Sequence, residues 1–170
     1  MEVVEFGPLT DAQRAELEGG EEHPFGTEGI ELCWRAKERH LMLRDGEGGL
    51  VASTGLLVAE VNVADSEPFQ VVGVGGVFVT RAHRGQGLAL VVVEAALERA
   101  ARMGPAVAML FCRDAVVGLY RKLGFELVEP PVHVLQPTGS AVMPVNTMWR
   151  PLIADAAWPR GEVFVQSEPF

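Results

Sequence analysis

The chain has 170 residues, 48% of them hydrophobic, and a formal net charge of −9. This length fits one domain with a sizeable buried core, so we treat 1–170 as a single domain with its core over 38–152 and a tail over 153–170. The acidic balance argues against general nucleic-acid binding, which needs clustered lysine and arginine. It fits a cationic small molecule as partner, and it equally fits a surface charge that only keeps the protein in solution.

The first predicted elements are a short strand over 3–6 and a helix over 12–17. Thr10 or Asp11 can cap this helix, and Gly19-Gly20 can end it. A second helix is predicted over 27–37. Acidic residues dominate this region, which is typical of a solvated face or of an anionic lip for a basic substrate: Asp11, Glu16, Glu18, Glu21, Glu22, Glu28 and Glu31.

A β-rich section follows, with strands predicted over 40–44, 50–63 and 69–79 and a hairpin turn at 45–49. The period then becomes helical over 87–103, and 106–111 has the uniform apolar character of a buried strand. Asp114 can cap a helix that ends at Leu123-Gly124. The last predicted strands begin at Phe125, resume over 132–135 after the break at Pro130-Pro131, and end with 142–152. This order indicates a mixed α/β fold.

Two cysteines, Cys33 and Cys112, are too few for a disulfide framework and lack the spacing of a zinc site. We expect both to be reduced and mostly buried. The N-terminus lacks the features of a signal peptide, and no apolar run is long enough to cross a bilayer. The sequence therefore predicts a cytoplasmic protein without membrane contact.

The main functional signal is the turn Arg84-Gly85-Gln86-Gly87-Leu88-Ala89, between a predicted strand and a predicted helix. The first amides of a helix have no partner within the helix, and the helix dipole places positive charge there. Glycines let a phosphate approach the main chain, and Arg84 can add a charge-assisted contact. The turn predicts a pyrophosphate site that requires no metal, although ordinary strand-to-helix connections also use glycine. Its spacing is neither that of the Walker loop nor that of the dinucleotide fingerprint.

A second motif is Tyr120-x-x-x-Gly124-Phe125, which contains the only tyrosine in the chain. A phenol has a pKa of about 10 and a thiol one of about 8.5, so a tyrosine can protonate a departing thiolate. A half-buried tyrosine packed against Phe125 is the purely structural alternative.

Arg84-x-x-Gly87-x-Ala89 followed by the tyrosine motif resembles the GNAT superfamily of N-acetyltransferases, over roughly 50–152. The resemblance implies a mostly antiparallel central sheet that is splayed between its two middle strands and flanked by helices. It also implies acetyl-CoA (coenzyme A) as cofactor and Tyr120 as general acid. The residues implied to hold the pantetheine arm are Val77, Phe78 and Val79, and those implied to hold the pyrophosphate are Arg84, Gly85, Gln86, Gly87, Leu88 and Ala89. A bulge at Gly75-Gly76 would open the slot for the arm.

The segments 134–139 and 158–164 resemble, more weakly, the closing segments of aminoglycoside 2'-N-acetyltransferases. This resemblance implies that Glu162 helps to deprotonate a substrate amine. Glu60 and His133 are further candidates for the base. Two departures from the family patterns stand out: Gly75 replaces a substrate-binding Glu, and Arg113 replaces an Asn that contacts the arm.

These observations predict direct transfer of an acetyl group from acetyl-CoA to a primary amine of a small cationic molecule, catalysed by Tyr120 and Glu162 without a metal. One alternative is a non-catalytic acyl-CoA sensor, which would use the same phosphate-binding turn. Another is a protein lysine acetyltransferase, for which we expect an open groove. A homodimer that forms through an exposed strand and the tail is also compatible with the sequence.

Overall fold

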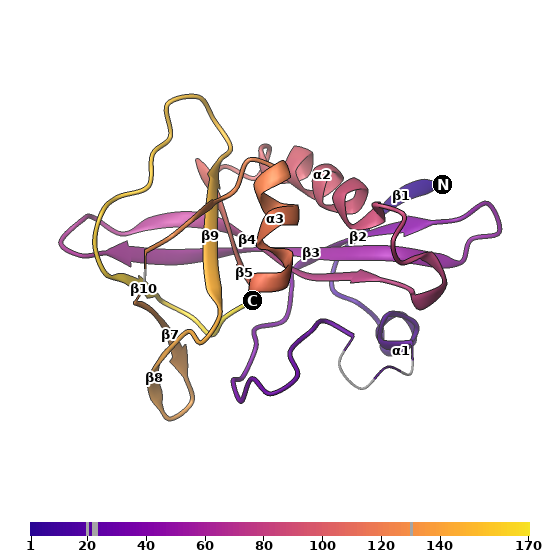
Figure 1. Cartoon of the computed structure of the whole chain (residues 1–170), viewed down its shortest axis with the longest axis horizontal. Helices are drawn as coiled ribbons and strands as arrows, with labels where there is room; N and C mark the ends of the chain where they lie inside the picture. The colour runs from indigo at the N-terminus through magenta and orange to yellow at the C-terminus, as the bar shows by residue number, and fades with distance from the viewer. Residues whose placement is uncertain (20, 22–23, 130) are drawn as a thin grey trace.

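The computed structural model of the chain describes residues 1–19, 21, 24–129 and 131–170 (Figure 1). Gly20, Glu22 and Pro130, used above as a helix end, part of the acidic region and a strand break, lie outside the described residues. The helices are α1 (Asp11–Glu18), α2 (Leu88–Ala100), α3 (Asp114–Lys122) and a single 3₁₀ turn, Arg81–His83. The strands are β1 (Glu2–Phe6), β2 (Arg39–Arg44), β3 (Leu50–Val63), β4 (Phe69–Val79), β5 (Val107–Cys112), β6 (Glu126–Leu127), β7 (Val132–Gln136), β8 (Gly139–Val142), β9 (Asn146–Pro151) and β10 (Val163–Val165).

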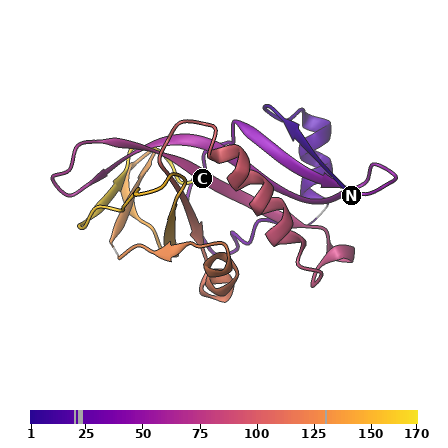
Figure 2. The same cartoon turned by 90° about the horizontal axis from the view of Figure 1, so that it is seen from above.

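All these strands join one sheet, in the order β6-β9-β5-β4-β3-β10-β7-β8, with β2 also paired to β3 and β1 to β2. Among the described strands, the pairs β4–β5 and β7–β10 are parallel and the others are antiparallel. The sheet curls strongly, as Figure 2 shows from above. The predicted mixed α/β fold with a mostly antiparallel sheet is confirmed.

Local sequence explains most element boundaries. Thr10 caps α1 in a reciprocal capping box with Gln13, and Gly19 ends it at a φ of 57°. The predicted cap of α3 was wrong by one residue: Arg113 occupies the N-cap, and Asp114 is the first helical residue. Asp114 accepts a hydrogen bond of 2.6 Å from Asn146 instead.

The predicted helix over 27–37 is wrong, because this segment has no regular secondary structure. Its main chain bonds to distant segments: the amide of Cys33 donates to the side chain of Gln136, and that of Arg35 donates to the carbonyl of Pro169. Gly29, at a φ of 73°, also breaks the helical conformation. Cys33 is consequently exposed, contrary to expectation, whereas Cys112 is buried.

The tail adds a strand that the sequence did not predict. In β10, Val163 pairs with Val63 of β3 and with Val132 of β7, so the tail lies inside the sheet. β8 was also missed, because it is a short hairpin partner of β7 with an exposed, weakly apolar sequence.

Helices cover both faces of β2 and β3. Leu41 and Leu43 of β2 belong to the core cluster beneath α2, whereas Arg44, which points to the other face, pairs with Glu16 of α1 at 2.8 Å. α1 and α2 therefore lie on opposite faces, and the buried residues of β3 and β4 lie between them. Within the described part of the chain, no helix has the length and apolar character needed to span a membrane.

Candidate functional site

A bulge interrupts the pairing of β3 and β4 at the predicted place. Ser53 pairs with Phe78 and Gly55 pairs with Gly75, so β4 holds one more residue than β3 between these pairs. Gly76 lies within this interval at a φ of 60°, a conformation that favours glycine. The bulge redirects the end of β4 just before the glycine-rich turn.

Beyond the bulge, β4 and β5 diverge. Their parallel pairing is confined to Val72 with Ala108 and Gly73 with Met109, although β4 continues to Val79 and β5 to Cys112. The diverging ends border a cavity of about 620 Å³, lined there by Val77, Val79, Phe111 and Cys112. The predicted splay between the two middle strands is therefore present.

The turn 84–89 lies at the edge of this cavity, which reaches Ala89 in the first turn of α2. Gly85 and Gly87 have φ values of 78° and 75°, and a Cβ on either would meet open space. Gly87 is the N-cap of α2, so the first amides of the helix lack partners within it. Of the residues 84–89, only Ala89 lines the cavity. The turn therefore combines helix-start amides that lack partners within α2 with glycines that have open space beside them, next to the cavity.

The side chain of Arg84 is already engaged in protein contacts. Its guanidinium donates to the carbonyl of Val79 at 3.1 Å and to the carboxylate of Glu21 at 2.6 Å. Arg84 thus fixes the end of β4 to the segment that follows α1. Nε and Nη2 make these contacts, and the predicted contact of Arg84 with a pyrophosphate stays a prediction.

Tyr120, from α3, lines the cavity beside Cys112 of β5. It is buried and makes an edge-on contact with Phe125, with ring centroids 6.0 Å apart. Burial raises the pKa of Tyr120 above its ordinary value, and the nearby thiol of Cys112 adds to the effect. Burial also raises the pKa of Cys112, to about 11. Both groups therefore keep their protons at neutral pH.

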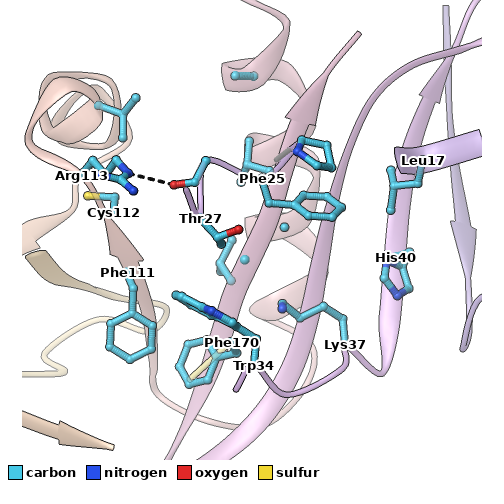
Figure 3. A pocket seen from close by; sticks show the side chains of 18 of the residues that line it. Leu17, Phe25, Thr27, Trp34, Lys37, His40, Phe111, Cys112, Arg113 and Phe170 are labelled. Carbon is cyan, nitrogen blue, oxygen red and sulfur yellow. Dashed lines mark hydrogen bonds between the residues drawn. The ribbon is translucent and has the colours of Figure 1, made fainter. Parts of the chain in front are cut away.

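The part of the cavity away from the turn 84–89, here called the far half, has aromatic side chains on its walls and basic side chains on its floor (Figure 3). Phe25, Trp34, Phe111 and Phe170 supply the aromatic surface. Phe170 is buried, and its ring packs directly on Gly73: a Cβ added to Gly73 would lie 2.6 Å from the nearest ring carbons. The tail therefore closes this side of the cavity.

Lys37 and His40 are the ionisable groups on this floor that Figure 3 labels. Burial lowers the pKa of Lys37 to about 8, and the charge of Arg35 lowers it further. Burial also lowers the pKa of His40, with the charge of Lys37 as a second cause. His40 is therefore neutral at pH 7 and able to accept a proton.

The irregular segment 24–38 forms one wall of the cavity. Arg113, at the start of α3, donates to the carbonyl of Gly26 at 2.8 Å (Figure 3). It also donates to the carbonyl of Glu28, and the two bonds tie this wall to the splayed strands. Gln136 holds the segment further along by accepting from the amide of Cys33 and donating to its carbonyl. Arg113 therefore positions the wall.

A family model described as "Acetyltransferase (GNAT) domain" matches residues 21–128. The chain belongs to the GNAT acetyltransferase family. Members of this family depend on acetyl-CoA, which is therefore the cosubstrate of this chain. A search of curated proteins found no match.

Two solved structures illustrate the shared GNAT fold. The GNAT family N-acetyltransferase YhbS of Escherichia coli, in complex with CoA, is 23% identical with a TM-score of 0.57, over 94% of this chain and 78% of that one. ElaA of Escherichia coli is 19% identical with a TM-score of 0.58, over 88% of this chain and 98% of that one.

The GNAT site residues fit acetyl-CoA. A Cβ at Gly85 or Gly87 would occupy open space beside the amides of the turn, where a diphosphate can approach. Val77 and Val79 line the slot between β4 and β5, which suits an extended arm. Phe78 does not line the cavity; its buried side chain packs edge-on against Phe25, so only its main chain is available.

The structure does not bring Glu162 to Tyr120. Glu162 accepts a hydrogen bond of 2.6 Å from His133 and is not among the cavity residues. It adjoins Val163, which pairs with Val63, eight residues along β3 from Gly55 beside the cavity. At about 3.3 Å per residue, this separation is roughly 26 Å. Glu60 does not line the cavity either.

Sequence analysis missed the residues of the far half of the cavity. Lys37, Trp34 and His40 lie in or beside the segment wrongly predicted as a helix. Phe170 lies in the tail, where Glu162 was the predicted site residue. The directly paired glycines Gly55 and Gly75 were a usable signal, since two glycines in strand interiors indicate close approach of another group.

Proposed function

We propose that this GNAT acetyltransferase transfers the acetyl group of acetyl-CoA directly to a primary amine of a small molecule. The observation that carries the proposal is a single cavity that extends from Ala89 and Val79, past Tyr120, to Lys37 and His40. Such a cavity allows a thioester and an amine to meet beside one acid group.

Acetyl-CoA supplies the acetyl group as an activated thioester. Main-chain amides of 85–89 bind the pyrophosphate, and Val77 and Val79 direct the arm along the slot. Tyr120 is the proposed proton donor to the leaving sulfur. Its raised pKa keeps the phenol protonated at neutral pH but also makes the transfer less favourable, so the proton must move as negative charge develops on the sulfur. A main-chain amide near Phe78 or Val79 would stabilise the carbonyl oxygen of the thioester.

The amine must lose a proton before it attacks. The sequence assigned this role to Glu162, which lies away from the cavity. Within the cavity, His40 is the better placed acceptor, since its lowered pKa keeps it neutral at pH 7. A base that acts through water is sufficient for this step.

The walls of the cavity favour a small acceptor. Phe170 and the wall held by Arg113 close the far half, whereas a protein lysine acetyltransferase would need an open groove. The net charge of −9 predicted a cationic acceptor. The basic side chains that line the cavity are Arg14, Arg35, Lys37 and Arg113, and its one acidic side chain is Glu18. The proposed acceptor is therefore a small molecule with a primary amine, and no positive charge beyond that amine is proposed.

The replacement Tyr120→Phe tests the acid role, because it removes one hydroxyl and keeps the ring. We expect turnover to fall about 100-fold, measured as thiol release with an amine panel, and the dissociation constant of CoA to stay within about twofold. Unchanged turnover would contradict the role of Tyr120. Tight CoA binding without acetylation of any amine would instead support the acyl-CoA sensor.

A further inference from the structure

Aromatic rings from three parts of the chain gather in the far half of the cavity (Figure 3). They belong to Phe25 and Trp34 of the irregular wall, Phe111 of β5 and Phe170 of the tail. Phe111 and Phe170 contact each other, with ring centroids 5.0 Å apart. Phe25 is 37% exposed, and Trp34 and Phe111 are half-buried. The protein therefore leaves part of this aromatic surface uncovered.

Glycines of β4 make room for two of these rings. A Cβ added to Gly73 would lie 2.6 Å from the ring of Phe170, which is too close for a side chain to be accommodated without a shift. A Cβ added to Gly76 would lie 3.9 Å from the ring of Phe25. The strand β4 is therefore covered here by aromatic rings from other segments, where its own side chains would otherwise stand.

Two basic side chains of the far half are engaged within the protein. Arg35 forms an ion pair of 2.6 Å with Glu38. Cε of Lys37 and the main-chain carboxyl carbon of Phe170 lie together over Gly75, at 2.8 and 2.7 Å from the position of an added Cβ. Ligand pockets combine such a small number of polar groups with a largely apolar and aromatic lining. The main interaction that the far half offers to the body of an acceptor is therefore apolar contact.

The aromatic surface is continuous with the place of reaction. The same cavity is lined by Tyr120 and by the slot between β4 and β5. Phe111 and Cys112 are neighbours at the end of β5, and both line this cavity. A ring packed against Phe111 would therefore direct a short attached chain toward the slot, where the thioester is proposed to lie.

We propose that the acceptor is an arylalkylamine, a primary amine joined by a short carbon chain to an aromatic ring, and that Trp34 and Phe111 bind this ring. Aromatic rings that meet edge-on or offset gain energy beyond the burial of their area. This inference rests on the proposed acetyl transfer and specifies its acceptor. Trp34 and Phe111 are specificity residues, and the proton transfers remain with other groups.

The test compares three primary amines that share a two-carbon chain. 2-Phenylethylamine carries an aromatic ring, 2-cyclohexylethylamine carries a saturated ring with as many carbons, and ethylamine carries no ring. In the unaltered protein we expect kcat/KM for 2-phenylethylamine to be at least about threefold above that for 2-cyclohexylethylamine. We expect it to be at least about 10-fold above that for ethylamine, because a buried ring contributes its apolar area.

Trp34→Leu and Phe111→Leu each remove an aromatic ring and keep an apolar side chain. In both variants the ratio of kcat/KM for the phenyl amine to that for the cyclohexyl amine should fall toward one, with a higher KM for the phenyl amine. Trp158→Leu and Phe164→Leu are the matched controls, because Trp158 and Phe164 are also half-buried and are not among the cavity residues. The controls should keep the ratio. Because the ratio is taken within each variant, a smaller folded fraction does not change it.

Two results would overturn the proposal. One is a kcat/KM for 2-phenylethylamine that does not exceed those for the other two amines in the unaltered protein. The other is an unchanged ratio in both cavity variants. If no amine is acetylated, the proposed function fails, and calorimetry in the presence of CoA then tests the aromatic site alone. N-acetyl-2-phenylethylamine should bind more tightly than its cyclohexyl counterpart, and equal affinities would refute the site.

Discussion

Gly87 combines backbone conformation and ligand access in one residue. Its φ of 75° caps α2, and its missing Cβ leaves space beside the free amides. Gly87→Ala should lower the free energy of unfolding by roughly 1–2 kcal/mol because of the left-handed conformation, and it should also weaken CoA binding. Gly104→Ala is the control, since Gly104 has a φ of 110°, open space around it and no place in the cavity lining. Urea unfolding and CoA titration of both variants provide the measurement; equal losses of CoA affinity would contradict the role of Gly87.

Lys37 makes a prediction about stability and pH. Its pKa in the folded chain, about 8, lies below its value in the unfolded chain, about 10.4. Between these values the unfolded chain binds more protons, so this residue makes stability rise with pH. Lys37→Met should therefore be more stable than the unaltered chain at pH 7, and the difference should shrink as the pH approaches 10. Urea unfolding across this range checks the trend, with Lys122→Met as control, and a difference independent of pH would contradict it.

Residue patterns predicted the glycine-rich turn and Tyr120 as site residues but did not predict the far half of the cavity. Arg84 to Ala89 and Tyr120 lie in local motifs, so their neighbours in sequence are also their neighbours in space. Lys37 and Phe170 meet over Gly75 from segments far apart in the chain. No local period encodes such a meeting.

At the scale of elements, β3 and β4 occupy the predicted ranges because long β-branched runs bounded by turns specify strands. The segment 27–37 was wrongly predicted, since its apolar residues follow a helical spacing but pack against the tail and β7 instead. Tertiary contacts overrode local propensity there. β10 was too short to leave a pattern.

The hold of Arg113 on this irregular wall can be tested. Arg113→Ala removes the hydrogen bonds to the carbonyls of Gly26 and Glu28. We expect faster hydrogen exchange over 26–38 and an increase of about 10-fold in the KM for the acceptor, with a smaller effect on CoA. Arg121→Ala, an exposed substitution on the same helix, serves as control. Unchanged exchange in Arg113→Ala would show that other contacts hold the wall.

At the scale of the whole molecule, net charge and local charge differ in sign. The chain carries −9 overall, whereas the charged side chains that line the far half of the cavity are mainly basic. Composition therefore describes the outer surface and says little about the cavity. The tail likewise belongs to the sheet through β10 and to the cavity through Phe170, although composition gave it no role.

The grip of the α2 turn on a diphosphate is the central claim, and calorimetry tests it most directly. The unaltered chain is titrated with acetyl-CoA and with acetyl-pantetheine, which lacks the diphosphate. We predict one binding event for acetyl-CoA at micromolar concentrations, as is common for enzyme substrates, and binding of acetyl-pantetheine at least about 100-fold weaker. Absence of acetyl-CoA binding, or equal affinity for the two compounds, would contradict the account.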